Sequence, residues 1–330
     1  MSYSIGVDLG GTNLRIAAVN EQGSLLEKVT LATRLSLGRD RVLDDMCQAI
    51  RALAAKYRGQ GTLQGIGIGV PGIIDMRTGM LRESPNLPGW ADYPVRGEIE
   101  KRLGARVVLE NDANCAALGE KWLGAGRDVD DLAMLTLGTG VGGGIVLGGR
   151  IWHGMTGMAG EFGHMTIGPD GLPCKCGSRG CLEVYASATA VVRMAREQIE
   201  LGMAPGLARV AASGAEFTAE TVYRLAAQGD DAAQHIFGQV GSALGIALAT
   251  IVNGLNLSMY VIGGGLSGAW DAFSPTMFRE VRDRSMVYAA TAPESSDDIQ
   301  PDGKTVITRA RLGSDAGLFG AARLATVSGV

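Results

Sequence analysis

Three cysteines and one histidine lie close together in the middle of the chain. Cys174, Cys176 and Cys181 fall within the short stretch PCKCGSRGCLE, and His164 lies upstream in GEFGHM. Three thiolates and one imidazole form a four-ligand tetrahedral set of the type that holds structural zinc. A closed set of four ligands leaves no position for water, which argues against catalytic zinc. The alternative interpretation is a group of free cysteines without a metal.

Two glutamates and two glycines accompany this cysteine cluster. Gly177 and Gly180 would let a tight loop fold around an ion, because glycine adopts backbone conformations closed to other residues. Glu161 and Glu183 lie on either side of the cluster in the sequence, so a structural ion would fix both carboxylates in space. The pattern therefore predicts a zinc-braced loop that presents hydrogen-bond acceptors to a polyhydroxylated ligand.

A second polar group, ENDAN, follows the apolar run RVVL. Strand ends in parallel sheets are where α/β proteins bind ligands. A general base for an alcohol must be a carboxylate within hydrogen-bond reach and partly shielded from water. Asp112 fits that role, with Asn111 and Asn114 able to orient hydroxyl groups. The alternative is structural, because Asp112 or Asn111 could simply cap the helix that follows.

Glycine-rich loops follow three apolar segments: DLGGTN at 8–13, LGTGVGGG at 137–144 and IGGGLSG at 262–268. Exposed backbone N–H groups in such loops can cradle phosphate oxygens. Asp8 heads the first loop and could hold Mg²⁺ directly or through water. No loop has a GK[ST] ending, and strand-like IVLGGRIW follows the second, so neither a P-loop nor a dinucleotide fingerprint is present. The first two loops could also be plain β-hairpin turns, and the third by itself indicates only a sharp bend of the backbone.

The remaining pattern alternates strands and helices, which predicts an α/β protein. Strand-like segments at the N-terminus give way to helical spacing over 40–57, and residues 183–253 are almost entirely helical in pattern. The echo between the loops at 8–13 and 137–144 indicates two halves of related build with a cleft between them. We expect a smaller domain over 1–115 plus about 305–330, and a larger domain over 116–304 that carries the zinc loop.

Composition limits the class of protein. The chain has 330 residues, 46% of them hydrophobic, and a net charge of −4, which disfavours nucleic acid as a partner. No basic stretch precedes the first apolar segment, as a signal peptide would require. The run ALGIALATIVNGLNL is interrupted by asparagines and predicts a buried core helix, so no membrane association is expected. Five cysteines, an odd number, do not suggest a disulfide framework, and we expect a cytoplasmic protein.

Taken together, these motifs resemble the ROK family of sugar kinases and repressors. DLGGTN, SPNLPGW, ENDAN, LGTGVGGG, GEFGH, CKCGSRGCLE and IGGG occur in family order over nearly the whole chain. The resemblance implies the two-domain fold shared by actin and the hexokinases, which is ribonuclease H-like, with the ligand cleft between the domains. It also implies ATP and Mg²⁺ as cofactors and a structural Zn²⁺.

The resemblance assigns roles residue by residue. Asp112 would be the base that takes the proton from the sugar 6-hydroxyl. The ring hydroxyls would contact Asn111, Glu161, His164 and Glu183, with Asn86 as a further contact. Asp8 would help hold Mg²⁺, and the phosphates would face Gly10, Gly11, Thr12, Thr139 and Gly140, with Gly264 and Gly265 near the adenosine. His164 would place one ring nitrogen on zinc and turn the other toward the sugar.

The implied activity is ATP-dependent phosphorylation of a hexose, which makes the chain a hexokinase-type phosphotransferase. The string from SPNLPGW through CLEVYAS looks most like glucokinases, and this favours glucose, converted to glucose 6-phosphate. N-acetylmannosamine and N-acetylglucosamine kinases share the zinc loop and stay as alternatives, and polyphosphate could replace ATP. A sugar-responsive repressor is a remote alternative, because the phosphate loop begins at residue 8 and leaves no room for a DNA-binding segment. Relatives are commonly dimers, so a homodimer or higher homo-oligomer is expected.

Overall fold

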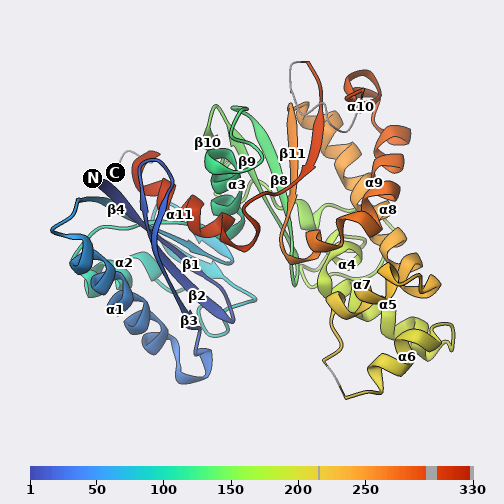
Figure 1. Cartoon of the computed structure of the whole chain (residues 1–330), viewed down its shortest axis with the longest axis horizontal. Coiled ribbons are helices and arrows are strands. Elements are labelled where there is room, and N and C mark those ends of the chain that lie inside the picture. The colour runs from blue at the N-terminus through green and yellow to red at the C-terminus, as the bar shows by residue number, and fades with distance from the viewer. Residues whose placement is uncertain (215, 295–302, 328–330) are drawn as a thin grey trace. The chain divides into compact units, whose positions relative to one another are not determined.

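The computed structural model describes residues 1–214, 216–294 and 303–327. The protein is of the α/β class, as the sequence predicts, and the chain divides into two compact units (Figure 1). The first unit comprises Met1–Met134, Gly144–Gly160 and Arg311–Val330, and the second comprises Leu135–Gly143 and Glu161–Ala310.

The first unit is built on a five-stranded sheet with the strand order β3-β2-β1-β4-β7. The strands are β1 (Ser2–Leu9), β2 (Asn13–Asn20), β3 (Leu25–Ala32), β4 (Thr62–Val70) and β7 (Val108–Asn111). The first three strands form an antiparallel meander, whereas β4 runs parallel to both β1 and β7. A small hairpin of β5 (Ile73–Asp75) and β6 (Met80–Glu83) follows β4. The parallel pairing brings the carboxyl ends of β1, β4 and β7 to one edge.

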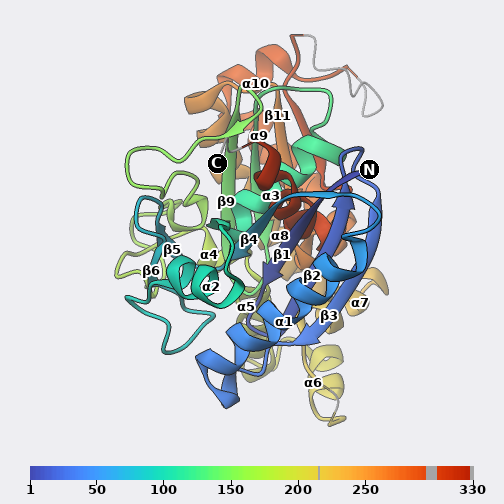
Figure 2. The same cartoon turned by 90° about the vertical axis from the view of Figure 1, so that its left-hand side faces the viewer.

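Helices cover both faces of this sheet. The 3₁₀ turn η1 (Leu35–Leu37) leads into α1 (Arg39–Tyr57), which lies beside α2 (Val95–Leu103) (Figure 2). Met46 and Ile50 of α1 pack with Ile5 and Val7 of β1 in the main core. The other face is covered by α3 (Asp112–Leu123) and by α11 (Ala316–Val327), which follows the 3₁₀ turn η4 (Gly313–Asp315).

Glycine lets α11 approach the sheet and α3 closely. A methyl group on Gly67 of β4 would collide with the carbonyl oxygen of Ala321 in α11. A methyl group on Gly320 of α11 would collide with the carbonyl oxygen of Cys115 in α3. Because real Cβ atoms do not approach backbone this closely, both positions need glycine.

The second sheet has the strand order β10-β9-β8-β11-β12. Its strands are β8 (Leu132–Leu137), β9 (Val141–Leu147), β10 (Arg150–Ile151), β11 (Met259–Gly263) and β12 (Val306–Arg309), and the division between the units falls within β8 and β9. The helices of the second unit are η2 (Phe162–His164), α4 (Glu183–Ala186), α5 (Ala188–Glu200), α6 (Pro205–Ala211), α7 (Ala219–Ala227), α8 (Asp231–Leu255), η3 (Gly265–Ala269), α9 (Trp270–Arg284) and α10 (Met286–Thr291). Figure 1 shows α8 and α9 running alongside one another.

The apolar run that predicts a core helix forms the C-terminal part of α8. Among the described residues, this one helix is long and apolar enough to cross a membrane, with a mean hydropathy of 1.6 over its best window, 67% of which is buried. Phe237, Leu244 and Leu248 are completely buried. The helix therefore has the burial of a core element, as expected from its sequence.

The domain limits expected from the sequence stay a prediction. The contacts within the chain group α3 and Gly144–Gly160 with the first unit, whereas the expected smaller domain ends at residue 115. At the C-terminal end, the expected segment begins at about 305 and the compact unit begins at Arg311. Residues 328–330 of that expected segment lie outside the described residues.

Candidate active site

The four residues of the cysteine cluster converge in the second unit. One ligand atom from each of His164, Cys174, Cys176 and Cys181 lies within 4.8 Å of the others. Cys174 Sγ is 3.8 Å from His164 Nδ1, and Cys176 Sγ is 3.7 Å from Cys181 Sγ. Two sulfurs that each lie about 2.3 Å from a shared zinc ion would be roughly 3.8 Å apart in a tetrahedron. The donor set therefore fits a tetrahedral metal ion.

The chemistry of the thiols also fits a cation. Burial and the neighbouring thiols raise the pKa of Cys181 to about 12, whereas the backbone N–H of Ser178 lowers the pKa of Cys176. Three thiolates at such close range repel one another unless a cation neutralises them. A metal ion that displaces the thiol protons would supply that charge.

Glycines shape the loop, as the sequence predicts. Gly177 and Gly180 have φ angles of 91° and 67°, which lie in the left-handed region. The Cys174 N–H donates to the Ser178 carbonyl at 2.8 Å, and the Gly177 N–H donates to the Cys174 carbonyl at 3.1 Å. The backbone is thus folded back on itself, with the sulfurs turned to one side.

The two glutamates that flank the cluster in the sequence have different neighbours. Glu161 lies beside His164, and Glu183 lies beside the second glycine loop. His164 Nε2 is 4.0 Å from Glu161 Oε2, so the ring turns Nδ1 to the thiols and Nε2 to a carboxylate. Burial raises the pKa of Glu161, His164 opposes that shift, and the charge of Glu183 adds to it. Glu183 Oε2 accepts the N–H of Val141 at 3.0 Å. Carboxylates and imidazole thus gather beside the second glycine loop.

The second glycine loop is a turn between β8 and β9, and the start of α5 donates hydrogen bonds to its carbonyl groups. The Gly138 N–H donates to the Gly140 carbonyl at 2.9 Å. The Ala188 N–H donates to the Gly138 carbonyl at 2.8 Å, and Thr189 Oγ1 donates to the Thr139 carbonyl at 2.7 Å. Thr139 itself is exposed and available to a ligand.

The third glycine loop lies against the end of β8 in the same unit. Gly264 has a φ of 82°, and a methyl group there would collide with the backbone of Leu137. Gly264 and Gly265 are both exposed. The third loop therefore lies against Leu137, the last residue of β8 before the second glycine loop, while a shared role of the two loops on a nucleotide stays a prediction.

The first glycine loop lies in the first unit and is a hairpin turn, in which the Gly10 N–H donates to the Asn13 carbonyl at 2.9 Å. Thr12 is exposed at its tip. Asp8 lies at the end of β1, where its Oδ2 is 3.1 Å from Arg15 Nη1. Burial raises the pKa of Asp8, and Arg15 opposes that shift. One carboxylate at a strand end suits Mg²⁺, which binds through one or two carboxylates plus substrate phosphates.

The ENDAN motif spans the end of β7 and the start of α3 in the first unit. Asn111 is the N-cap of α3, and its Oδ1 accepts the N–H groups of Ala113 and Asn114 at 2.9 and 3.2 Å. Its Nδ2 donates to the Gly72 carbonyl at 3.1 Å. Asp112 is the first residue of the helix, and its Oδ1 accepts the Ala113 N–H at 2.9 Å. The capping role thus belongs to Asn111.

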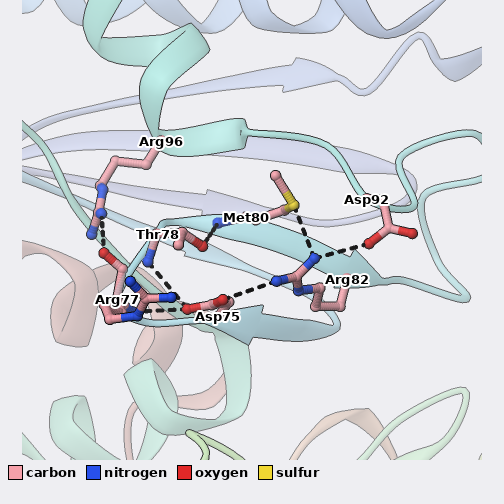
Figure 3. A network of polar contacts seen from close by, with 7 residues as sticks. All are labelled: Asp75, Arg77, Thr78, Met80, Arg82, Asp92 and Arg96. Carbon is pink, nitrogen blue, oxygen red and sulfur yellow. Dashed lines mark hydrogen bonds and ion pairs between the residues drawn. The ribbon is translucent and has the colours of Figure 1, made fainter.

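Asn86 is an exposed residue on a loop of the first unit whose base is tied by ion pairs. Arg82 donates to Asp75 at 3.0 Å and to Asp92 at 3.2 Å, so its guanidinium joins the β5–β6 hairpin to the far end of the loop (Figure 3). A Cβ on Gly11 would lie 3.0 Å from the Asn86 carbonyl oxygen. The loop is therefore in backbone contact with the first glycine loop.

Sequence reasoning missed several residues that support these groups. Glu110 is 2% exposed and contacts His153, and Glu120 is fully buried and accepts the N–H groups of Arg311 and Leu312 at 3.1 and 2.7 Å. Thr189 holds the second glycine loop. Glu110 lies inside the ENDAN motif, so its acidic side chain within an apolar strand was a visible signal. The partners of Glu120 are far away in sequence, and no local pattern identifies them.

Comparison with known proteins places the whole chain in one group. Residues 4–327 match the ROK family. The chain is 37% identical to the glucokinase of Halalkalibacterium halodurans, covering 96% of this chain and 93% of that one. It is 38% identical to the glucokinase of Thermotoga maritima, covering 97% and 96%. It superimposes on the crystal structure of a ROK family glucokinase from Streptomyces griseus in complex with glucose and AMPPNP, with a TM-score of 0.75, 33% identity and 98% coverage of both chains.

The alternative classes have more distant representatives. An N-acetyl-D-glucosamine kinase of Haemophilus influenzae is 29% identical over 97% of this chain. A putative xylose repressor of Caldicellulosiruptor is 34% identical, but this chain covers 71% of its length. The glucokinases of Halalkalibacterium halodurans and Thermotoga maritima match with higher identity over almost their full length. The two-domain fold class expected from the sequence is confirmed by the solved structures of ROK relatives.

Proposed function

The chain belongs to the ROK family, and on that premise we propose that it transfers the γ-phosphoryl group of ATP to the 6-hydroxyl of glucose. The observation that carries this proposal is the similarity of nearly the whole chain to glucokinases. A structural relative bound to glucose and an ATP analogue supports the same substrate pair. The enzyme is accordingly a hexokinase-type phosphotransferase.

Each unit would supply one part of the chemistry. In the first unit, Asp8 would hold Mg²⁺, and the loop of Gly10, Gly11 and Thr12 would face the phosphates. In the second unit, Thr139 and Gly140 would face the phosphates as well, with Gly264 and Gly265 near the adenosine. Bound Mg²⁺ would neutralise charge on the transferring phosphoryl group.

The sugar would be held by hydrogen-bonding side chains. Asn86 and Asn111 of the first unit, and Glu161, His164 and Glu183 of the second, are proposed to contact its hydroxyl groups. Zn²⁺ would be held by His164, Cys174, Cys176 and Cys181, where it would brace the loop and fix the imidazole. The 4.0 Å approach of His164 Nε2 to Glu161 supports a shared role for these two side chains.

Asp112 is proposed as the general base. Its carboxylate would take the proton of the 6-hydroxyl while that oxygen forms a bond to the γ-phosphorus. The bond from the γ-phosphorus to the bridging oxygen breaks, and ADP leaves with the electron pair. Positioning and charge neutralisation supply most of the acceleration in such transfers, and a base typically adds about 10²–10⁴-fold.

The test is a substrate panel measured as kcat/KM. Glucose, mannose, N-acetylglucosamine and N-acetylmannosamine would each be offered with ATP, and glucose also with polyphosphate. We expect glucose with ATP to give the highest value by at least tenfold. Higher values for an N-acetylhexosamine would move the assignment to that class, and absence of sugar-dependent ADP release would leave a non-enzymatic role such as a repressor.

Two further expectations accompany this proposal. We propose a homodimer or higher homo-oligomer, to be tested by light scattering coupled to size-exclusion chromatography. We also propose a cytoplasmic protein that acts on a sugar and a nucleotide, without nucleic acid or membrane as a partner. A monomeric mass at micromolar concentration would contradict the first expectation.

A further inference from the structure

A buried carboxylate lies two residues before the proposed base in the sequence and has no role in the chemistry described so far. Glu110, in β7, is 2% exposed. Its Oε1 accepts the backbone N–H of Asn111 and the Nδ2 group of Asn114, both at 2.9 Å. Its Oε2 lies 2.6 Å from His153 Nε2. Burial of a carboxylate is costly unless its oxygens are hydrogen-bonded, and here both of them are.

These bonds act on the backbone that carries Asp112. Asn111 caps α3, and Asp112 is the next residue. Glu110 therefore fixes the peptide unit immediately before the cap, and through Asn114 it also fixes the first turn of the helix. Asn114 Oδ1 is buried and has no hydrogen-bond partner among the residues that the structure describes, so the amide of Asn114 is oriented by its bond to Glu110.

His153 comes from a different part of the first unit, and its imidazole contacts the Glu110 carboxylate. The side chain is 37% exposed, and its carbonyl oxygen accepts the Ala159 N–H at 3.3 Å. The hydrogen bond to Glu110 raises the pKa of His153, and burial opposes that shift. The pair thus joins the ENDAN motif to the segment that leads along the chain toward Glu161.

Among the described residues, Asp8 and Asp112 share an electrostatic neighbour with Glu110, the thiol of Cys115. Burial raises the pKa of Cys115 well above its ordinary value, and the charges of Glu110, Asp8 and Asp112 reinforce that shift. The Cys115 thiol therefore stays neutral and adds no charge. Arg15 is paired with Asp8 rather than with Glu110. A proton on His153 consequently offsets one of several neighbouring negative charges.

We propose that Glu110 and His153 form a positioning pair for Asp112, in which protonated His153 keeps Glu110 paired and the paired carboxylate holds the start of α3 in the orientation that proton abstraction needs. This inference rests on the proposed kinase function. Neither residue touches the reacting atoms, so both are positioning residues. A misplacement of about 1 Å at a reacting group can cost roughly 10²-fold in rate, which gives this pair a measurable effect.

The first test is spectroscopic and needs no activity. The chain has three histidines, so NMR of histidine-labelled protein gives three imidazole signals, and His153→Gln identifies one of them. We expect Glu110→Gln to lower the pKa of that signal by about one unit or more, because an opposite charge favours the protonated ring. The exposed His235 serves as the internal control. An unchanged His153 titration would show that the pair does not exist in solution and would overturn the proposal.

The second test is kinetic, with folding checked by circular dichroism and melting temperature. His153→Ala removes the donor, and we expect kcat for glucose to fall about 10–100-fold while the KM for ATP changes little. His153→Gln keeps an amide donor and should recover part of that loss, whereas His235→Gln should match the wild type. The double variant Glu110→Gln/His153→Ala should be no slower than the slower single variant, because residues that act as a unit are non-additive.

The pH profile separates positioning from plain stabilisation. The pair is intact below the raised pKa of His153 and is lost as pH rises through it, so wild-type kcat should decline on the alkaline side. His153→Gln cannot titrate there and should lack that decline. A folded His153→Ala variant with kcat within twofold of wild type would refute the inference while leaving the kinase proposal intact. A wild-type protein inactive on every hexose would instead refute the kinase proposal, and the NMR titration would still decide whether the pair exists.

Discussion

Asn111 and Asp112 are neighbours with different tasks. Both oxygen and nitrogen of the Asn111 side chain are committed to backbone groups, two amides of α3 and the Gly72 carbonyl. Asp112 accepts one backbone N–H through Oδ1. An asparagine suits the cap because its amide both accepts and donates, whereas a base needs a carboxylate. This division supports Asp112 as the base.

The first prediction concerns Asp112 itself. Asp112→Asn keeps the size and the hydrogen bond to the Ala113 N–H but removes the proton acceptor. We expect kcat to fall by about 10²–10⁴-fold, with glucose affinity measured by calorimetry changed by less than about threefold. Asp128→Asn, at an exposed carboxylate, is the matched control. Full turnover by a folded Asp112→Asn variant would rule out the base assignment.

At the scale of elements, local hydrogen bonds alone do not hold the cysteine loop in place. Its short backbone bridges, Thr166 with Cys181 and Pro173 with Arg179, connect a few residues only. A metal ion that joins His164 to three thiols would add a cross-link over this whole segment. The binding free energy of such an ion is part of the folding free energy.

The second prediction follows for that loop. Cys176→Ser should abolish bound zinc, measured by elemental analysis, and should lower both the melting temperature and the affinity for glucose, because the ion fixes His164. Lys175→Ala, between two of the ligands, should keep the metal and both properties. Purified wild-type protein without a stoichiometric metal ion would contradict this account.

The first unit also depends on the close contact between helices α3 and α11. A Cβ on Gly320 would collide with the Cys115 carbonyl oxygen, and a Cβ on Gly119 of α3 would collide with the Ala316 carbonyl oxygen of α11. The helices can approach this closely only because neither residue has a side chain. Since α3 begins at Asp112 and α11 begins beside Asp8, their crossing helps to set both positions.

The third prediction tests this crossing. Gly320→Ala should destabilise the protein by about 1–3 kcal/mol or more, because the added methyl group forces the helices apart. Gly238→Ala in α8 is the control: no atom lies near the added methyl group, so alanine should be neutral or stabilising by up to about 1 kcal/mol. Equal melting temperatures for the two variants would show that the close packing is not limiting.

At the scale of the whole molecule, the chain passes between two compact units several times. The residues proposed to act on the substrates are divided between these units. Asp8, Asn86, Asn111 and Asp112 belong to the first unit, and Glu161, His164 and Glu183 to the second. Glu120 accepts the N–H groups of Arg311 and Leu312, and so it fixes the point where the chain re-enters the first unit for the last time. A ligand that binds only the folded protein should stabilise it by mass action.

The fourth prediction concerns this stabilisation. Glucose at a hundredfold excess over its Kd should stabilise the folded protein by about 2.7 kcal/mol, and a non-hydrolysable ATP analogue with Mg²⁺ should add to it. Differential scanning calorimetry should record this as a higher melting temperature. L-Glucose at the same concentration is the control. A larger shift with N-acetylglucosamine than with glucose would argue for the alternative substrate class.

Local sequence determined much of this protein. The alternation of strands and helices, the left-handed glycines of the cysteine loop, the four clustered ligands and the capping asparagine all follow from short-range rules, since period, turn chemistry and ligand spacing act over a few residues. The first two glycine loops form turns, whereas their role on phosphates stays a prediction. Family motifs in order added the class of reaction, which no single motif carries.

Only the tertiary structure decided which distant groups meet. Glu110 and His153 are separated by 43 positions, and Glu120 and Arg311 by 191, so no periodic pattern connects them. Such contacts depend on strand order, on the parallel pairing of β4 with β7 and on helices that pack over glycine. A sequence records the chemistry of each side chain, but burial exists only after the chain has folded. Burial makes an unpaired carboxylate costly, and this cost determines which partner the carboxylate needs.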